Sequence, residues 1–220
     1  MAVNDKTFES VTKKYTTLEK EASAEFTEKK SLFIGHAKPV KTDDEALEFV
    51  KKIKEKYSDA THNVYAYYLR SGAMARYSDD NEPQGTAGMP VLEVIKKSGC
   101  DDCVVVVTRY FGGILLGAGG LVRAYANAAA LALDAAHIVT YEEYTVFSLT
   151  CDYGEYNKIA FELDCAAAIT DKCEFADRVN MQFAVKSDIS ESVKRKILEL
   201  SGGKLIPEFL GVRFDADKKR

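Results

Sequence analysis

The apolar positions of the chain form two kinds of pattern around a glycine-dense loop in the middle of the sequence. Cys103 to Thr108 is an apolar, mostly β-branched run without polar alternation, which predicts a strand buried on both faces. Leu121 to Ala136 is rich in alanine and contains neither glycine nor proline, which favours a helix. We therefore expect a buried strand, a glycine loop and a helix to follow one another here.

Patterns typical of strands precede this stretch. We expect an antiparallel pair over residues 15–25 and 30–39, joined by a turn at residues 26–29. The aromatic run from Asn63 to Leu69 predicts another strand. Residues 71–88 are rich in turn formers and are expected to form one long loop, a kind of segment that often carries function in compact domains.

Helical spacing occurs twice in the same part of the chain. Thr42 and Glu45 make the pattern of a capping box, and the helix that begins there is expected to run to about Tyr57. The face of this helix that we expect to be buried consists of Leu47, Val50, Ile53 and Tyr57. A shorter helix is expected from Met89 to Lys97, with Pro90 tolerated in its first turn.

After Ala136 the predicted elements are shorter. Helices are expected to begin at Asp152 and near Ile189, the second one ending at Gly202. Strands are expected at residues 144–151, 166–175, 179–185 and 210–214. The resulting order βαββαβ is that of a ferredoxin-like domain. We expect an α+β protein with two domains, residues 1–137 and 138–220.

Composition and charge narrow the classes of partner. The chain has 220 residues, of which 46% are hydrophobic and 29% charged, as is usual for globular proteins. Its formal net charge of -4 argues against a broad nucleic-acid-binding surface but not against a local basic patch. The first residues contain no apolar run typical of a secretory signal, and no segment resembles a membrane span. We expect a cytoplasmic protein with no membrane partner, in which the five cysteines are reduced thiols.

The cysteines include one CxxC pattern, Cys100-Asp101-Asp102-Cys103. A structural zinc site needs two more ligands, and no second pair has a suitable spacing. A redox pair usually lies at a helix N-terminus, whereas Cys103 enters the predicted strand. We therefore expect no metal site and no cofactor.

Candidate chemistry gathers at the glycine loop. The unpaired N–H groups of a helix N-terminus bind anions, and Arg109 and Arg123 flank the loop with positive charge. The loop is neither a Walker A motif nor a dinucleotide fingerprint, since it lacks Gly-Lys-Ser/Thr and has Val122 where a third small residue belongs. The predicted phosphate- or nucleic-acid-binding residues are Arg109, Gly112, Gly113, Gly117, Gly119, Gly120, Arg123, Arg76 and Lys30. Alternatively, the glycines only let the helix and strand pack closely, and the arginines pair with carboxylates.

The long loop supports a second hypothesis, because it contains Asp79, Asp80 and Glu82 and follows His62. Under this hypothesis the chain is an enzyme that acts on a phosphorylated or anionic small metabolite, and these four residues serve as acid, base or cation ligands. The spacing does not fit a calcium loop, and no nucleophile is evident, so no catalytic residue is assigned. In the simpler interpretation the carboxylates bind Arg109 or Arg123.

Several motifs resemble those of the YigZ/IMPACT family. They span Arg109 to Gly113, Leu116 to Tyr125, Thr61 to Tyr67, and Ser78 to Pro90. The last of them departs from the family pattern at Asn81, Gln84 and Met89. The resemblance covers the chain strongly to about Ala136 and weakly beyond.

The resemblance implies an N-terminal ribosomal-protein-like α/β sandwich, similar to domain IV of elongation factor G, and a C-terminal ferredoxin-like domain. By this analogy the protein contacts RNA or the ribosome, and eukaryotic family members are linked to the regulation of translation. Our leading hypothesis is a non-enzymatic, translation-related regulator that binds RNA or the ribosome through an anion-binding cleft. A third hypothesis is a protein-binding scaffold or homo-oligomer that uses a surface of Tyr65, Tyr67 and Tyr110.

Overall fold

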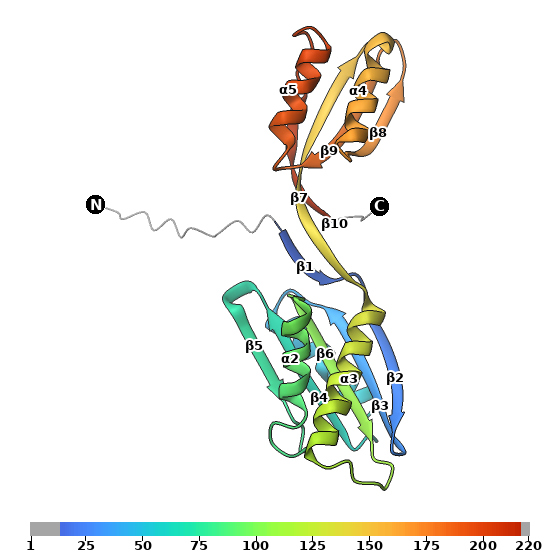
Figure 1. Cartoon of the computed structure of the whole chain (residues 1–220), viewed down its shortest axis with the longest axis vertical. Helices are drawn as coiled ribbons and strands as arrows, with labels where there is room; N and C mark the ends of the chain where they lie inside the picture. The colour runs from blue at the N-terminus through green and yellow to red at the C-terminus, as the bar shows by residue number, and fades with distance from the viewer. Residues whose placement is uncertain (1–13, 217–220) are drawn as a thin grey trace, which may run out of the picture. The chain divides into compact units, whose positions relative to one another are not determined.

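The computed structural model describes residues 14–216, which form two compact units (Figure 1). One unit consists of residues 15–140, and the other of residues 141–216 together with Lys14. Residues 1–13, on which the expected lack of a secretory signal rests, and residues 217–220 lie outside the described range. The described part of the chain contains five α-helices and two sheets, so the predicted α+β class is confirmed.

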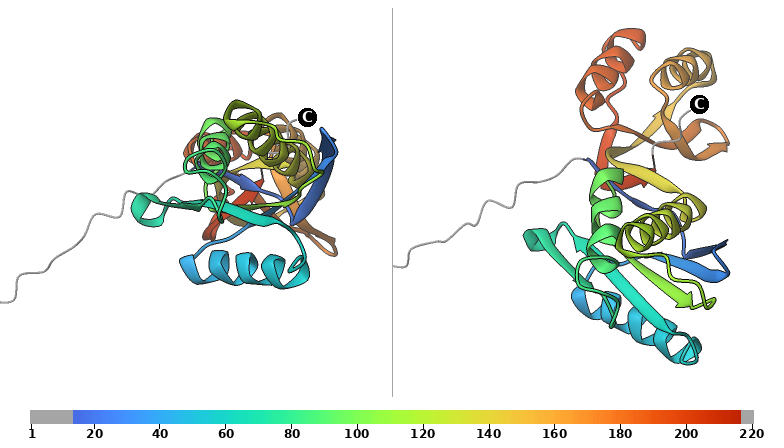
Figure 2. Two further views of the ribbon diagram at one scale, coloured as in Figure 1. Left: turned by 90° about the horizontal axis from the view of Figure 1, so that it is seen from below. Right: turned by 60° about the horizontal axis from the view of Figure 1, so that its bottom comes forward.

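The first unit is built around one antiparallel sheet with the strand order β2-β3-β6-β4-β5. The strands in the first half of the chain are β1 (Lys14–Leu18), β2 (Ala22–Glu28), β3 (Ser31–Pro39), β4 (His62–Leu69), β5 (Met74–Ser78) and β6 (Cys103–Tyr110). The helices are α1 (Asp43–Lys56), α2 (Gly88–Ser98) and α3 (Ala118–Ala136). Helix α1 covers one face of the sheet, and α2 and α3 cover the other (Figure 2).

Strand β6 lies at the centre of this sheet and is buried on both faces, as its unbroken apolar sequence predicts. Val104 and Val106 pack with the buried residues of α1. Val105 and Val107 belong to the core under α2 and α3. Because side chains alternate along a strand, Arg109 continues the row that faces α3. The position of Arg109 on the α3 side of the sheet therefore follows from the packing of β6.

Helix α3 lies very close to strand β3, because both elements carry small residues at their contact. A Cβ atom added to Gly35 would lie 2.3 Å from the carbonyl oxygen of Ala128 and 2.9 Å from the Cβ of Ala132. These alanines are fully buried. The alanine-rich sequence of α3 thus allows an approach to the sheet that larger side chains would prevent.

The predicted turn at residues 26–29 is wrong. Strand β2 continues to Glu28, because the ring of Phe26 stacks on Phe33 with 5.4 Å between the ring centroids. The turn consists of Lys29 and Lys30, whose φ angles are +45° and +66°. Two positive φ angles are typical of the two-residue turns that best fit the twist of a hairpin.

Two further expectations differ from the structure. Residues 71–88 do not form one loop, because β5 pairs with β4 within that range. In α1 the capping box is present, since the Glu45 N–H donates to the Thr42 hydroxyl at 3.2 Å. However, Leu47 is 39% exposed, and the buried face consists of Ala46, Phe49, Val50 and Ile53. Val50 and Ile53 are buried as predicted, but Phe49, the largest apolar residue of the helix, occupies the core in place of Leu47.

The second unit has the predicted βαββαβ order and the ferredoxin-like strand order β10-β7-β9-β8, with all pairs antiparallel. Its elements are β7 (Ile138–Cys151), α4 (Tyr153–Cys165), β8 (Ile169–Phe175), β9 (Val179–Lys186), α5 (Ser190–Leu200) and β10 (Glu208–Ala216). Its core contains Phe147, Phe183 and Ile197. Within residues 14–216 no helix has the length and apolar character needed to cross a membrane.

The close contact at Gly35 predicts that Gly35→Ala destabilises the first unit by about 1–3 kcal/mol or more, because the new methyl group meets backbone that cannot move freely. Chemical denaturation followed by circular dichroism measures the change. Gly119→Ala is the matched control, since a Cβ there meets only the end of the Arg123 side chain at 3.5 Å. Equal stability of the two variants would contradict the close-packing argument.

Acid sensitivity is expected from His36 on β3. Burial, reinforced by the positive charge of Lys56, lowers the pKa of His36 to about 4. In the unfolded chain the ordinary pKa is about 6.5, so the unfolded state binds the proton first. The contribution of neutral His36 to stability is therefore complete above pH ~6.5 and is lost as the pH falls towards ~4. The ring nitrogen Nδ1 lies 2.8 Å from the Ser23 hydroxyl, which a glutamine can also contact.

Denaturation midpoints measured across this pH range test the expectation. His36→Gln should reduce the loss of stability on acidification, whereas His137→Gln should not, because His137 is exposed. The same acid profile in wild type and His36→Gln would show that other groups account for it.

Candidate functional site

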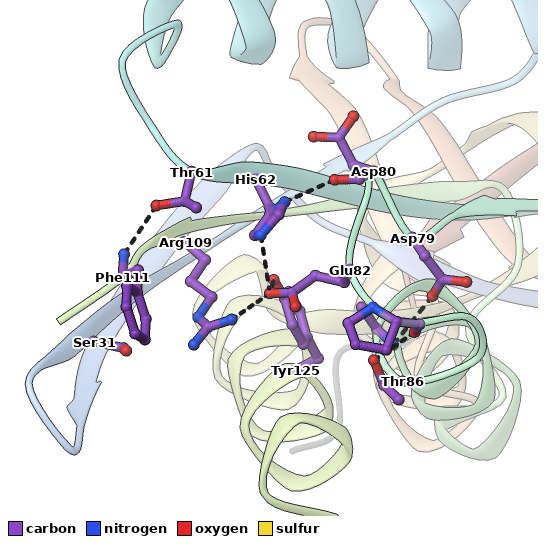
Figure 3. Close-up of polar contacts among 12 residues, drawn as sticks. Ser31, Thr61, His62, Asp79, Asp80, Glu82, Thr86, Arg109, Phe111 and Tyr125 are labelled. Carbon is purple, nitrogen blue, oxygen red and sulfur yellow. Dashed lines mark hydrogen bonds and ion pairs between the residues drawn. The ribbon is translucent and has the colours of Figure 1, made fainter. Parts of the chain in front are cut away.

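The carboxylate of Glu82 is the centre of a buried polar cluster (Figure 3). Its Oε1 atom accepts hydrogen bonds from Arg109 Nη1 at 2.5 Å and from the Tyr125 hydroxyl at 2.7 Å. The Nε2 atom of His62 lies 3.7 Å from the same oxygen. The Glu82 and Arg109 side chains are 3% and 6% exposed. The cluster thus joins the loop before α2 to β4, β6 and α3.

The strand register explains why these side chains meet. His62 lies opposite Arg109 in the pairing of β4 with β6, so both side chains are on the α3 side of the sheet. The Arg109 guanidinium lies over the rings of Phe33 and Phe111, 5.4 Å and 5.5 Å from their centroids. Its Nε atom is the buried side-chain nitrogen that has no hydrogen-bond partner among the described residues. Arg109 thus contacts Glu82 and two aromatic rings and keeps one unused donor.

The hydrogen bonds of His62 and Tyr125 determine the protons that they carry. Nδ1 of His62 lies 2.8 Å from the carbonyl oxygen of Asp80, which can only accept, so Nδ1 carries a proton and donates it. Burial and the negative charge of Glu82 raise the pKa of Tyr125 well above its ordinary value. Tyr125 thus stays protonated and donates to Glu82.

Two carboxylates of the same loop have separate partners. Asp80 accepts hydrogen bonds from Lys54 Nζ and from the Asn63 N–H, both at 2.6 Å. Asp79 accepts from the N–H groups of Gly85, Ala87 and Gly88 at 2.9, 3.1 and 2.8 Å. Asp79 thereby occupies the N-terminus of α2. His62, Asp79, Asp80 and Glu82 do not converge as one catalytic group, although His62 and Glu82 do.

A pocket of about 410 Å³ lies beside this cluster and is named here the Glu82 pocket. His62, Glu82 and Arg109 line it, together with the N-terminus of α3 at Gly117 and Ala118. Gly117 has a φ of +72°, and no side chain caps the helix there. The remaining lining is mostly apolar and consists of Thr61, Pro83, Phe111, Leu115, Leu116 and Leu121.

Arg123 does not line the Glu82 pocket, so the predicted cleft shared with Arg109 is not formed. Arg123 lines a second pocket of about 250 Å³ between β2 and α3, together with Lys29, Glu28 and Asn127; this pocket is named here the Arg123 pocket. Arg123 is exposed, whereas Arg109 is buried and paired with Glu82. Arg109 thus pairs with a carboxylate, as the alternative predicts, and anion binding by Arg123 stays a prediction.

The other predicted binding residues are divided between the two faces of the sheet. Gly112 brings the Lys30 turn against the glycine loop, because a Cβ on Gly112 would lie 2.0 Å from the Lys30 backbone. Gly113, Gly117 and Gly119 are exposed in the loop or the first turn of α3, and Gly120 lines the Arg123 pocket. Arg76 pairs instead with Asp43 of α1 at 3.2 Å, and thus lies on the opposite face from α3.

Lys29 is the site residue that the sequence analysis omits. Two consecutive lysines follow β2 and could have indicated a basic turn. The predicted turn at residues 26–29 does not place Lys29 beside α3. Of the tyrosines proposed for a scaffold surface, Tyr67 is fully buried and donates to Asp43. Across residues 14–216, no three His, Cys, Asp or Glu side chains group in a way that could hold a metal ion.

Comparisons with known proteins match both units. Residues 29–133, which include every residue of the Glu82 cluster, match the Impact N-terminal domain. Residues 149–204 match a domain of unknown function, DUF1949. A solved structure described as the crystal structure of an hypothetical protein covers 90% of this chain and 98% of its own, with a TM-score of 0.57 and 27% identity.

Two curated relatives are similar over longer segments. The chain is 37% identical over 191 residues to IMPACT family member YvyE from Bacillus subtilis, covering 86% of this chain and 88% of the relative. It is 36% identical over 134 residues to IMPACT family member YigZ from Escherichia coli, covering 60% and 66%.

The buried pair predicts that Glu82→Gln destabilises the first unit by about 3–5 kcal/mol, because it leaves the Arg109 charge buried without its counter-ion. Urea denaturation followed by far-ultraviolet circular dichroism gives the free energy of unfolding. Glu93→Gln, an exposed change on α2, should alter it by less than about 0.5 kcal/mol. If Glu82→Gln also changed the free energy of unfolding by less than about 0.5 kcal/mol, the pair would not hold the loop.

Proposed function

The chain belongs to the IMPACT family, and on this premise we propose that it is a regulator of translation that binds RNA through a basic surface beside α3. This basic surface consists of Lys29, Lys30, Arg123 and the exposed backbone at the start of α3. It replaces the cleft around both arginines that the sequence predicts. The observation that carries the proposal is the set of three cations without counter-ions.

The three cations are exposed and form no ion pair or hydrogen bond with the described residues. Lys29 and Arg123 line the same pocket, and Lys30 adjoins Lys29 in the turn that packs on Gly112. Glu28 lines that pocket as well, so the charge of the local group is about +2. Arg70, Arg76 and Arg109 of the same unit are paired with carboxylates. Arg123, by contrast, keeps its charge available to an external phosphate and lies beside Lys29.

The start of α3 adds donors to this surface. Ala118 and Gly119 are exposed, and no side chain caps the helix, so its first N–H groups are open to a phosphate oxygen. Gly120 lines the pocket that contains Arg123. Backbone donors and a guanidinium can thus contact phosphates of one strand together.

The expected binding is local and moderate in strength. The net charge of the whole chain is -4, so long-range attraction to RNA is weak, and contacts to a few phosphates must supply the affinity. A link to translation rests on the family and on the expected likeness of its first domain to a domain of elongation factor G. The alternative of an enzyme has less support, because Asp79 and Asp80 are committed to backbone N–H groups and to Lys54.

A binding assay with variants of the basic surface tests the proposal. Wild-type protein should retain a single-stranded ribosomal RNA fragment on a filter at low salt, with affinity that falls as salt rises. The double variant Lys30→Ala, Arg123→Ala should bind more weakly, and its salt slope should decrease by about one for each lost contact. Sedimentation with ribosomes provides the second measurement.

Lys97→Ala is the matched control, because Lys97 is exposed on α2 and does not line the Arg123 pocket. It should bind like wild type. The proposal fails if wild-type protein does not bind at low salt, or if the double variant keeps the wild-type affinity and slope.

A further inference from the structure

We propose that the Glu82 pocket, whose charged residues differ from those of the basic surface, binds a small monocarboxylic acid with an apolar body. The pocket combines three properties, each of which restricts the ligand. Its walls are apolar, one end carries unused hydrogen-bond donors, and its charged residues nearly cancel.

The walls favour an apolar body of small size. Phe111, Leu115 and Leu121 line the pocket, and Leu115 is 82% exposed, so its apolar surface is available to a ligand. A volume of about 410 Å³ falls in the lower part of the range in which proteins enclose small ligands. Contact with a ligand would remove part of this apolar surface from water.

The donors favour a carboxylate at the other end. Arg109 is 5% exposed, and its Nε–H has no partner among the described residues although its Nη1 atom binds Glu82. A buried donor without an acceptor costs free energy, which a ligand oxygen would recover. Gly117 and Ala118 bring the uncapped N-terminus of α3 to the same pocket, and its N–H groups suit a second oxygen.

The charges favour a single negative charge. Arg109 and Glu82 form an ion pair, so together they contribute almost no net charge. The α3 N-terminus then attracts an anion, while the Glu82 carboxylate opposes a second negative charge in the same small volume. The His62 ring is oriented by the carbonyl oxygen of Asp80, 2.8 Å from its Nδ1. A monocarboxylate fits these conditions better than a phosphate dianion or an ammonium group.

The pocket adjoins the proposed RNA surface, and both include backbone at the start of α3. Their charged residues differ, because Lys29 and Arg123 do not line the Glu82 pocket, and Leu116 is the residue that lines both pockets. Failure of RNA binding would leave the carboxylate proposal standing, and the reverse also holds.

Nuclear magnetic resonance of ¹⁵N-labelled protein tests the proposal, with 3-phenylpropanoate as the probe. Titration to millimolar concentration should produce saturable shifts of the Arg109 Nε–H signal and of the amide signals of Ala118 to Gly120. Acetate tests the carboxylate without an apolar body, and 3-phenyl-1-propanol tests the apolar body without a charge. Both should shift these signals much less.

Two variants at exposed positions of α3 separate pocket binding from surface binding. Ala118→Phe should fill the pocket and weaken binding of 3-phenylpropanoate by about tenfold or more. Ala130→Phe adds the same ring at an exposed position outside the pocket and should leave binding unchanged. The proposal is overturned if 3-phenylpropanoate gives no saturable shifts, if the alcohol binds equally well, or if Ala118→Phe binds like wild type.

Discussion

The ion pair of Glu82 with Arg109 is the interaction on which the arrangement of the first unit depends. A guanidinium held within the interior needs a counter-ion, and Glu82 supplies it from a loop that has little apolar surface of its own. Tyr125 and His62 approach the same carboxylate, so one side chain connects α3, β4 and β6 to that loop. The Glu82 pocket borders the loop that this pair fixes in place.

Local spacing along the chain accounts for most of the fold. The unbroken valine run predicts a strand with two covered faces, and β6 has them, because α1 packs on Val104 and α3 packs over Val105. The order of elements after residue 137 predicts the ferredoxin-like topology for the same reason: each element carries its own periodicity. Local spacing does not predict the position of the turn at Lys29, because the stacking of Phe26 on Phe33, a contact between two strands, determines where β2 ends.

The candidate site depends on tertiary contacts that the spacing of residues along the sequence does not predict. Asp79, Asp80 and Glu82 lie within four positions, yet they bind a helix N-terminus, Lys54 and Arg109 in turn. Arg109 and Arg123 flank the same loop, but one is buried and the other exposed. Residue types identify the participants, and tertiary packing determines which charges cancel and which stay available to a ligand.

In the Lys29–Lys30 turn, the charged side chains come with an unfavourable backbone conformation. Lysine adopts positive φ angles less readily than glycine or asparagine, and two successive lysines do so here, at +45° and +66°. An Asn-Gly pair would suit this hairpin better and would erase both charges. The two lysines thus keep an unfavourable backbone conformation at the position where their side chains lie beside α3. Residues that fit the turn better would stabilise the hairpin but would remove the positive charge from this surface.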